Sequence, residues 1–211
     1  MMKTELIFIL DRSGSMHGLE QDTIGGFNGL IEKQKTESGE AIVSLLLFDD
    51  QQDLIIDKQS LENIKPLTDR EYYVRGCTAL LDAIGGTVTR ISRLQNETDE
   101  SDRPDKTMVV IITDGLENAS REFSYDKVKS LIEKKKKDNW EFMFLGANID
   151  AIGEAGRFGI DEDYAVEYRC DSEGTALNYC CVSEAISDIR ANRKLAASWK
   201  GKIENDLKSR K

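Results

Sequence analysis

The chain has 211 residues, of which 39% are hydrophobic and 32% are charged, and its formal net charge is −10. This length accommodates one α/β domain without room for a second full one, and the composition excludes a disordered chain. The negative charge argues against a general nucleic-acid-binding protein, which needs a basic surface.

Strand and helix patterns alternate along the chain, as a parallel α/β sheet requires. Continuous apolar runs at 6–10 and 108–112 predict strands buried on both faces, and segment 53–57, with charged ends, predicts an antiparallel edge strand. The other expected elements are helix 21–37, strand 41–48, helix 78–94, a polar loop at 95–106, helix 124–137, strand 140–145, helix 149–158, strand 164–168 and helix 174–190. We therefore predict a Rossmann-like three-layer αβα sandwich, with a mostly parallel six-stranded sheet and one antiparallel edge strand.

Oxygen-bearing side chains follow the two apolar strands. Asp11, Ser13 and Ser15 form an Asp-x-Ser-x-Ser run where the first strand ends, and Asp114 ends the 108–112 strand. Thr78 opens the 78–94 helix after a glycine turn. Ligands of open α/β sheets bind at the carboxyl ends of the strands. Hard oxygen donors with only two carboxylates favour Mg²⁺ or Mn²⁺ over Ca²⁺.

Two other interpretations compete with a metal site. Helix N-capping is a common role for Asp, Ser and Thr, but it does not explain Asp114 at the end of a strand. A metal-dependent hydrolase or phosphatase is the enzymatic alternative. A phosphatase that begins with Asp11 needs a second Asp at position 13, where this chain has serine. A serine hydrolase needs a histidine base, for which His17 is the only candidate, so we expect no enzymatic activity.

The five residues Asp11, Ser13, Ser15, Thr78 and Asp114 together resemble the metal-ion-dependent adhesion site of von Willebrand factor type A domains. That family's pattern is Asp-x-Ser-x-Ser, a distant Thr, and a distant Asp usually followed by Gly. The resemblance covers about residues 3–190 and is strongest to small stand-alone members from bacteria and phages. It implies a type A domain over 1–192 and a metal ion, Mg²⁺ or Mn²⁺, held by these five residues. It also implies a protein partner whose Asp or Glu completes the metal's shell.

The neighbours of these five residues allow more than one role. Asp82 could support the site, or it could be an acid favoured by the partial positive charge of a helix N-terminus. Glu117 and Asn118 are expected at the rim, where they could influence the choice of partner. His17 is expected to be a solvated loop residue. The basic run at 134–137 is expected to complement the end of a helix rather than bind nucleic acid.

Residues 193–211 form a basic C-terminal tail with seven basic and two acidic side chains, a net charge of +5 that leaves −15 for the rest. Apolar residues recur every fourth position in this tail, at Leu195, Trp199, Ile203 and Leu207. The tail could therefore be an amphipathic helix that docks on its own domain or on a partner, or it could be a frayed end.

The location of the protein is predicted from its cysteines and its N-terminal segment. Cys77, Cys170, Cys180 and Cys181 fit no Cys-x-x-Cys motif, which predicts reduced thiols in a cytoplasmic protein. The N-terminal apolar run at 6–10 is too short for a secretory signal or a membrane span, so we expect no membrane association.

Overall fold

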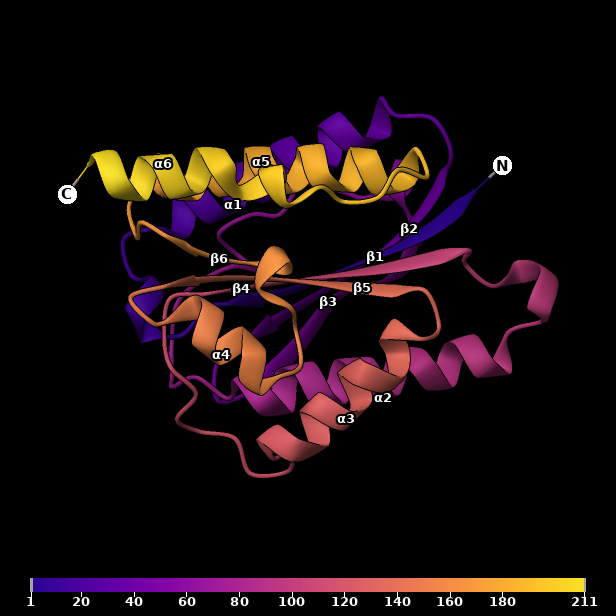
Figure 1. Ribbon diagram of the computed structural model, residues 1–211, viewed down its shortest axis with the longest axis horizontal. Coiled ribbons are helices and arrows are strands. Elements are labelled where there is room, and N and C mark those ends of the chain that lie inside the picture. The colour runs from indigo at the N-terminus through magenta and orange to yellow at the C-terminus, as the bar shows by residue number, and fades with distance from the viewer. Residues whose placement is uncertain (1, 211) are drawn as a thin grey trace.

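The computed structural model describes residues 2–210. Within this range the chain forms a three-layer α/β sandwich around a six-stranded sheet of order β3-β2-β1-β4-β5-β6 (Figure 1). The strands are β1 (Lys3–Asp11), β2 (Glu40–Phe48), β3 (Gln52–Ser60), β4 (Lys106–Thr113), β5 (Trp140–Ala147) and β6 (Ala165–Tyr168). The α-helices are α1 (Glu20–Lys35), α2 (Leu80–Glu97), α3 (Tyr125–Lys136), α4 (Ala151–Arg157), α5 (Ser172–Arg190) and α6 (Gly201–Ser209). Only β3 pairs antiparallel to its neighbour, so the predicted fold class is confirmed for the described residues.

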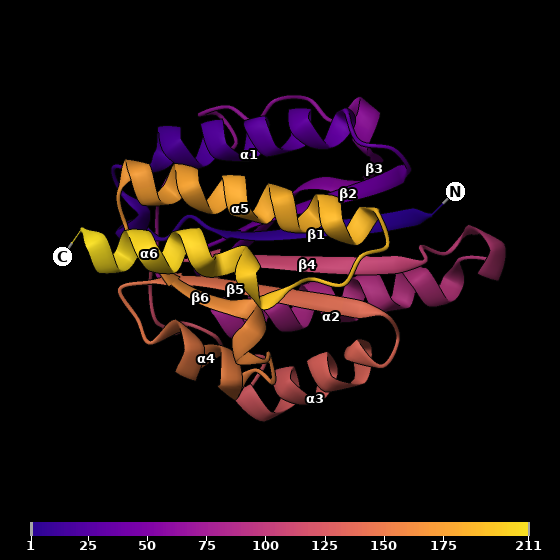
Figure 2. The same ribbon diagram turned by 45° about the horizontal axis from the view of Figure 1, so that its top comes forward.

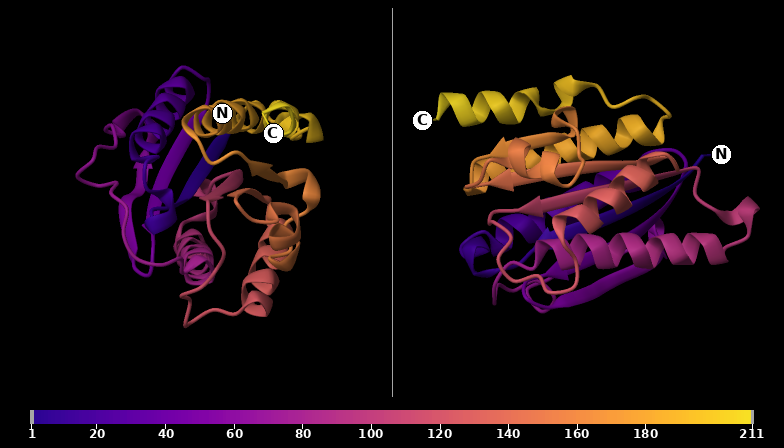
Figure 3. Two further views of the ribbon diagram at one scale, coloured as in Figure 1. Left: turned by 90° about the vertical axis from the view of Figure 1, so that its left-hand side faces the viewer. Right: turned by 60° about the horizontal axis from the view of Figure 1, so that its bottom comes forward.

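The continuous apolar runs fill both faces of the sheet. In β1, Leu6 and Phe8 belong to the core beneath α1, α5 and α6, whereas Ile7 and Ile9 belong to the core beneath α2, α3 and α4. Figures 2 and 3 show these two helical layers on opposite sides of the sheet. A strand covered by helices on both faces has no polar side, which explains why its sequence does not alternate.

Most element boundaries lie within three residues of the sequence expectation, and those of α2 and β3 illustrate the differences. Helix α2 runs from Leu80 to Glu97 with Ala79 as its N-cap, so it begins two residues beyond Thr78 and extends into the expected 95–106 loop. The Thr78 hydroxyl is directed to Ser13 Oγ at 3.1 Å. Strand β3 is longer than the expected 53–57, because its pairing with β2 extends from Gln52 to Ser60. Because β3 lies at the partly exposed edge of the sheet, it tolerates polar residues, so no apolar pattern marks where it ends.

The C-terminal tail lies against the domain. Helix α6 runs beside α5 in the same layer (Figure 2), with Ile203 buried in the shared core. Just before α6, the Trp199 indole donates to the Asp163 carbonyl at 2.8 Å, and Lys200 Nζ donates to the Glu162 carbonyl at 2.6 Å. The division into a domain over 1–192 and a separate tail stays a prediction. No helix among residues 2–210 has the length and apolar character needed to cross a membrane.

Candidate metal centre

The carboxyl ends of β1 and β4 lie side by side at one edge of the sheet. The register pairs Leu10 with Ile112, which brings the residues after each strand together. Asp11 is 1% exposed, and its Oδ2 accepts a hydrogen bond from Thr113 Oγ1 at 2.6 Å. Its Oδ1 accepts from the Ser13 backbone N–H, also at 2.6 Å. The first acidic side chain of the motif is therefore fixed in place by its own loop and by the neighbouring strand.

A chain of hydroxyl contacts joins the three loops that carry the motif. Thr78 Oγ1 lies 3.1 Å from Ser13 Oγ, and Ser13 Oγ lies 3.1 Å from Ser15 Oγ. Ser15 Oγ donates to Asp114 Oδ1 at 2.5 Å. The structure thus brings together all five residues that the sequence singled out, from segments about a hundred residues apart.

Gly115 lies directly beside two hydroxyls of this cluster. A Cβ added at Gly115 would lie 3.3 Å from both Ser15 Oγ and Thr78 Oγ1, so any other residue would crowd the space beside the two hydroxyls. Burial raises the pKa of Asp11 to about 6, although the hydrogen bonds from Thr113 and Ser13 act in the opposite direction. Burial also raises the pKa of Asp114. A cation would offset the cost of keeping these two carboxylates ionised, so the donor set fits a hard divalent metal ion.

The helix-capping interpretation does not describe these hydroxyls. The short helix η1 (Gly14–Met16) has Ser13 at its N-cap without a side-chain capping bond, and the N-cap of α2 is Ala79. Among residues 2–210 there is also no group of three or more His, Cys, Asp or Glu residues suited to a metal ion. The candidate site is therefore distinguished by its serine and threonine oxygens, with carboxylates in the minority.

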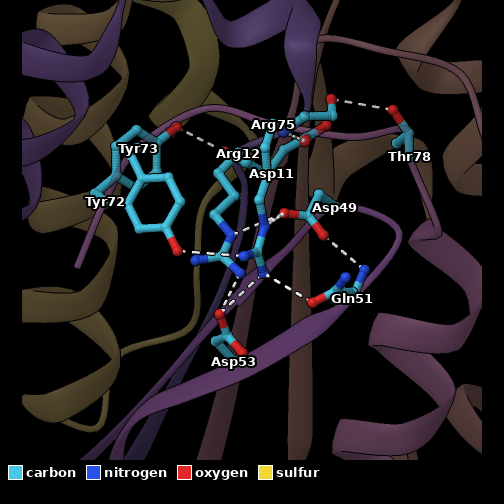
Figure 4. A network of polar contacts seen from close by, with 10 residues as sticks. Asp11, Arg12, Asp49, Gln51, Asp53, Tyr72, Tyr73, Arg75 and Thr78 are labelled. Carbon is cyan, nitrogen blue, oxygen red and sulfur yellow. Dashed lines mark hydrogen bonds and ion pairs between the residues drawn. The ribbon is translucent and has the colours of Figure 1, made fainter. Parts of the chain in front are cut away.

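On the β2–β3 side of the site, two arginines share two carboxylates. We call Arg12, Asp49, Asp53 and Arg75 the arginine clamp (Figure 4). Asp49 Oδ2 accepts from Arg12 Nε at 3.1 Å and from Arg75 Nε at 2.6 Å. Asp53 Oδ2 lies 3.1 Å from Arg75 Nη2 and also contacts Arg12. The side chains of Arg12 and Asp49 are 1% and 0% exposed, so the centre of the clamp is buried.

Two backbone hydrogen bonds join the same two loops as the arginine clamp. The Arg75 N–H donates to the Arg12 carbonyl at 2.9 Å, and the Gly14 N–H donates to the Gly76 carbonyl at 3.2 Å. Gly76 has a φ of +66°, a conformation that favours glycine. The loop that bears Thr78 is therefore joined to the Asp-x-Ser-x-Ser loop by both backbone and side chains.

On the opposite side of Thr78, the segment after β4 packs on the start of α2. We call residues 115–123 the Glu117 loop. Glu117 Oε2 accepts from the Leu81 N–H at 2.9 Å, and Asn118 Oδ1 accepts from the Thr78 N–H, also at 2.9 Å. Glu117 Oε1 accepts from the Ser120 N–H at 2.7 Å. These contacts assign Glu117 and Asn118 to holding the loop in place.

Asp82 and His17 also have defined surroundings. Asp82 lies in the first turn of α2, and its carboxylate accepts the backbone N–H groups of Arg121, Glu122 and Phe123 at 2.7, 2.9 and 2.8 Å. It therefore holds the Glu117 loop, whose Asn118 contacts Thr78, and this is a supporting role of the kind that was one of the two expected. The His17 side chain is 83% exposed and contacts Glu20, which agrees with the expected solvated loop residue.

Sequence reasoning missed several residues around the site. Arg12 and Arg75 stand within the segments that carry the motif, but nothing local shows that they share carboxylates from β2 and β3. Thr113, which orients Asp11, was recognisable only as the residue before Asp114. Cys170 lies after β6, and its thiol contacts Asp114 Oδ2 at 3.6 Å. The sequence signal that could have indicated the clamp is the pair Asp49 and Asp53, two acidic residues that follow β2, the strand next to β1.

Comparisons with known proteins place this fold. No family model matches the sequence, and no curated protein matches it. Solved structures do match. Proximal thread matrix protein 1 from the mussel byssus, with a zinc-occupied MIDAS motif, aligns at a TM-score of 0.61 and 15% identity. That alignment covers 88% of this chain and 46% of the mussel chain, so this chain spans less than half of the mussel protein's length.

Two further solved structures are named as von Willebrand factor type A proteins. The ArnB paralog VWA2 from Sulfolobus acidocaldarius aligns at a TM-score of 0.52 and 15% identity, covering 88% of this chain and 45% of that one. The vWF domain of the type V pili tip protein Mfa5 from Porphyromonas gingivalis aligns at 0.59 and 11% identity, covering 88% of this chain and 95% of that one. From the sheet order, the helical layers and these matches, we conclude that this chain has the fold of a von Willebrand factor type A domain.

Proposed function

We propose that this protein is a Mg²⁺-dependent protein-binding module, acting as an adaptor or assembly factor. In this proposal Asp11, Ser13, Ser15, Thr78 and Asp114 hold Mg²⁺ or Mn²⁺. The observation that carries it is the hydroxyl chain from Thr78 to Asp114 beside Gly115. A bound cation with few protein charges supplies an electrophilic centre for an outside carboxylate. The partner would be a protein that presents an Asp or Glu side chain.

The chemistry of the neighbouring residues supports binding rather than catalysis. Serine occupies position 13, where a phosphatase that uses Asp11 would need a second aspartate. His17 points to Glu20 and to solvent instead of the five residues of the site. The zinc-occupied MIDAS motif of the mussel protein supports a divalent cation at this place in the fold. A cytoplasmic location stays part of the proposal, and all four cysteines are free thiols.

Metal binding is tested by calorimetric titration of Mg²⁺ into the wild type and into Asp11→Ala. We expect the wild type to bind one ion and the variant to lose most of the affinity, because it loses one of two charged ligands. Mg²⁺ should raise the melting temperature of the wild type by mass action, but not that of the variant. Asp57→Ala, which removes an exposed carboxylate of β3, is the matched control. Undiminished binding by Asp11→Ala would contradict the assignment.

The role of the metal is tested by affinity capture from an extract, with Mg²⁺ or with EDTA, followed by mass spectrometry. A partner that depends on the metal should be captured by the wild type in Mg²⁺ and lost in EDTA. Thr78→Ala should lose it under both conditions, and added Mg²⁺ should restore capture only by the wild type. A partner that stays bound in EDTA would refute metal-mediated recognition even if the metal site itself is real.

A further inference from the structure

The arginine clamp joins the two loops that carry four of the five proposed ligands. Arg12 lies between Asp11 and Ser13 in the chain, and Arg75 lies three residues before Thr78. We infer that the clamp is a positioning device, in which Arg75 sets the place of Thr78 relative to Asp11 and Ser13 and thereby determines the affinity for the metal. This inference rests on the proposed metal-binding function.

The geometry of Asp49 makes the two loops depend on each other. One oxygen of its fully buried carboxylate accepts from Arg12 at 3.1 Å and from Arg75 at 2.6 Å. Moving either loop would leave part of a buried ion pair uncompensated, which is strongly unfavourable. The Thr78 loop is therefore held at one distance from the Asp-x-Ser-x-Ser loop, where Thr78 Oγ1 meets Ser13 Oγ at 3.1 Å.

The Arg75 guanidinium faces the protein rather than a ligand. Its Nε binds Asp49, and its Nη1 donates to Tyr73 Oη at 3.2 Å. Its Nη2 reaches Gln51 Oε1 at 3.3 Å and Asp53 Oδ2 at 3.1 Å. Figure 4 shows these bonds converging between the loops. Because each nitrogen is already engaged, the structure supports a positioning role for Arg75 over direct capture of an acidic partner.

Whether a substitution of Arg75 strengthens or weakens metal binding distinguishes a positioning role from electrostatic repulsion of the metal. A guanidinium near a cation site repels the cation, so charge alone makes Arg75 unfavourable for metal binding. Neutralising it should then strengthen binding. If Arg75 instead positions Thr78, neutralising it should weaken binding despite the reduced repulsion. Replacement by lysine keeps the charge but removes the planar fork that contacts two carboxylates at once.

We would titrate Mg²⁺ into the wild type, Arg75→Gln and Arg75→Lys by calorimetry, and measure the melting temperature of each in EDTA. The inference expects both variants to bind Mg²⁺ about 10–100-fold more weakly, the usual range for residues that orient metal ligands. Charge alone would make Arg75→Gln bind more tightly and leave Arg75→Lys unchanged. The glutamine and lysine variants together therefore distinguish the two explanations.

Arg90→Gln is the matched control. Arg90 pairs with Asp57 of the same strand β3 at 2.6 Å, and its side chain is 34% exposed, close to the 32% of Arg75. We expect this variant to bind Mg²⁺ as the wild type does. Arg75 variants with lowered melting temperatures and unchanged Mg²⁺ affinity would show a merely structural clamp and overturn the inference. If the wild type fails to bind Mg²⁺, the proposed function itself is wrong, and the inference falls with it.

Discussion

The two sides of Thr78 are fixed by different chemistry. On one side the arginine clamp uses ion pairs between side chains, with Arg12 1% and Asp49 0% exposed. On the other side the Glu117 loop is held by carboxylates that accept backbone N–H groups. Asp82 alone accepts three of them, and Glu117 accepts from the first turn of α2.

The two kinds of contact should differ in how much stability is lost when one partner is removed. Removing one partner of a buried ion pair leaves a buried charge without compensation, which costs much of a small domain's stability. Removing a carboxylate that accepts N–H groups leaves only neutral donors without partners, a smaller and more graded loss. Substitutions in the arginine clamp should therefore lower the free energy of unfolding more than substitutions in the Glu117 loop.

Arg12→Met is the strongest test of this contrast. It should lower the free energy of unfolding by about 3–5 kcal/mol, because Asp49 stays buried with only Arg75 to compensate it. Urea denaturation would measure the loss. Arg93→Met is the control, since Arg93 pairs with Glu97 at 63% exposure and such surface pairs contribute about 0–1 kcal/mol. Equal denaturation midpoints for Arg12→Met and the wild type would contradict the expected loss of stability.

Glu117→Gln tests the opposite side. The amide offers one oxygen where the carboxylate offers two, so at least one of the N–H groups of Leu81 and Ser120 loses its acceptor. The expected loss of unfolding free energy is about 1–3 kcal/mol, again from urea denaturation. Glu122→Gln changes an exposed side chain of the same loop and should have little effect. A loss larger than that of Arg12→Met would reverse the ranking of the two sides.

Acidification should weaken the arginine clamp at Asp53, which is its most exposed side chain. The hydrogen bond from Arg12, together with the charges of Arg12 and Arg75, lowers the pKa of Asp53, although partial burial acts against this. The folded protein therefore holds this carboxylate ionised more strongly than the unfolded chain does. Its stabilisation is complete at neutral pH and is lost as the pH falls below about 4, the ordinary range of aspartate.

Comparing wild type and Asp53→Asn checks this expectation. The wild type should be more stable at neutral pH, and the difference should shrink as the pH falls through about 4. Because the Asp53 side chain is 44% exposed, the effect should be the smallest of the three. A stability difference that does not change with pH would show that Asp53 acts through packing or hydrogen bonding alone.

The fold and the five candidate ligands were predictable because they depend on local patterns. Strands buried on both faces leave continuous apolar runs, and Asp11 and Asp114 stand where two such runs end. The fold prediction is confirmed, and the structure brings the five residues together, while their binding of a metal stays a prediction.

The supports of the site were not predictable in this way, because each depends on contacts between distant segments. Arg12 meets Asp53 only once β3 pairs with β2, and the predicted edge strand did not show which side chain its aspartate would meet. Asp82 and Glu117 depend on the path of the loop after β4, which periodicity does not describe. The start of α2 was placed too early for a related reason, since Thr78 looks like a capping residue until its actual partner, Ser13, is known.

The tail binds where the edge strand β6 begins. Strand β6 lies at the end of the sheet, where unpaired backbone groups can recruit a strand from another molecule. The carbonyls of Glu162 and Asp163 accept from Lys200 and Trp199, and Lys200 Nζ also reaches the Ala165 carbonyl at 3.1 Å. The Ala165 carbonyl belongs to β6 itself, and the carbonyls of Glu162 and Asp163 belong to the turn that precedes it. An incoming strand would therefore have to displace Lys200 before it could pair at the start of β6.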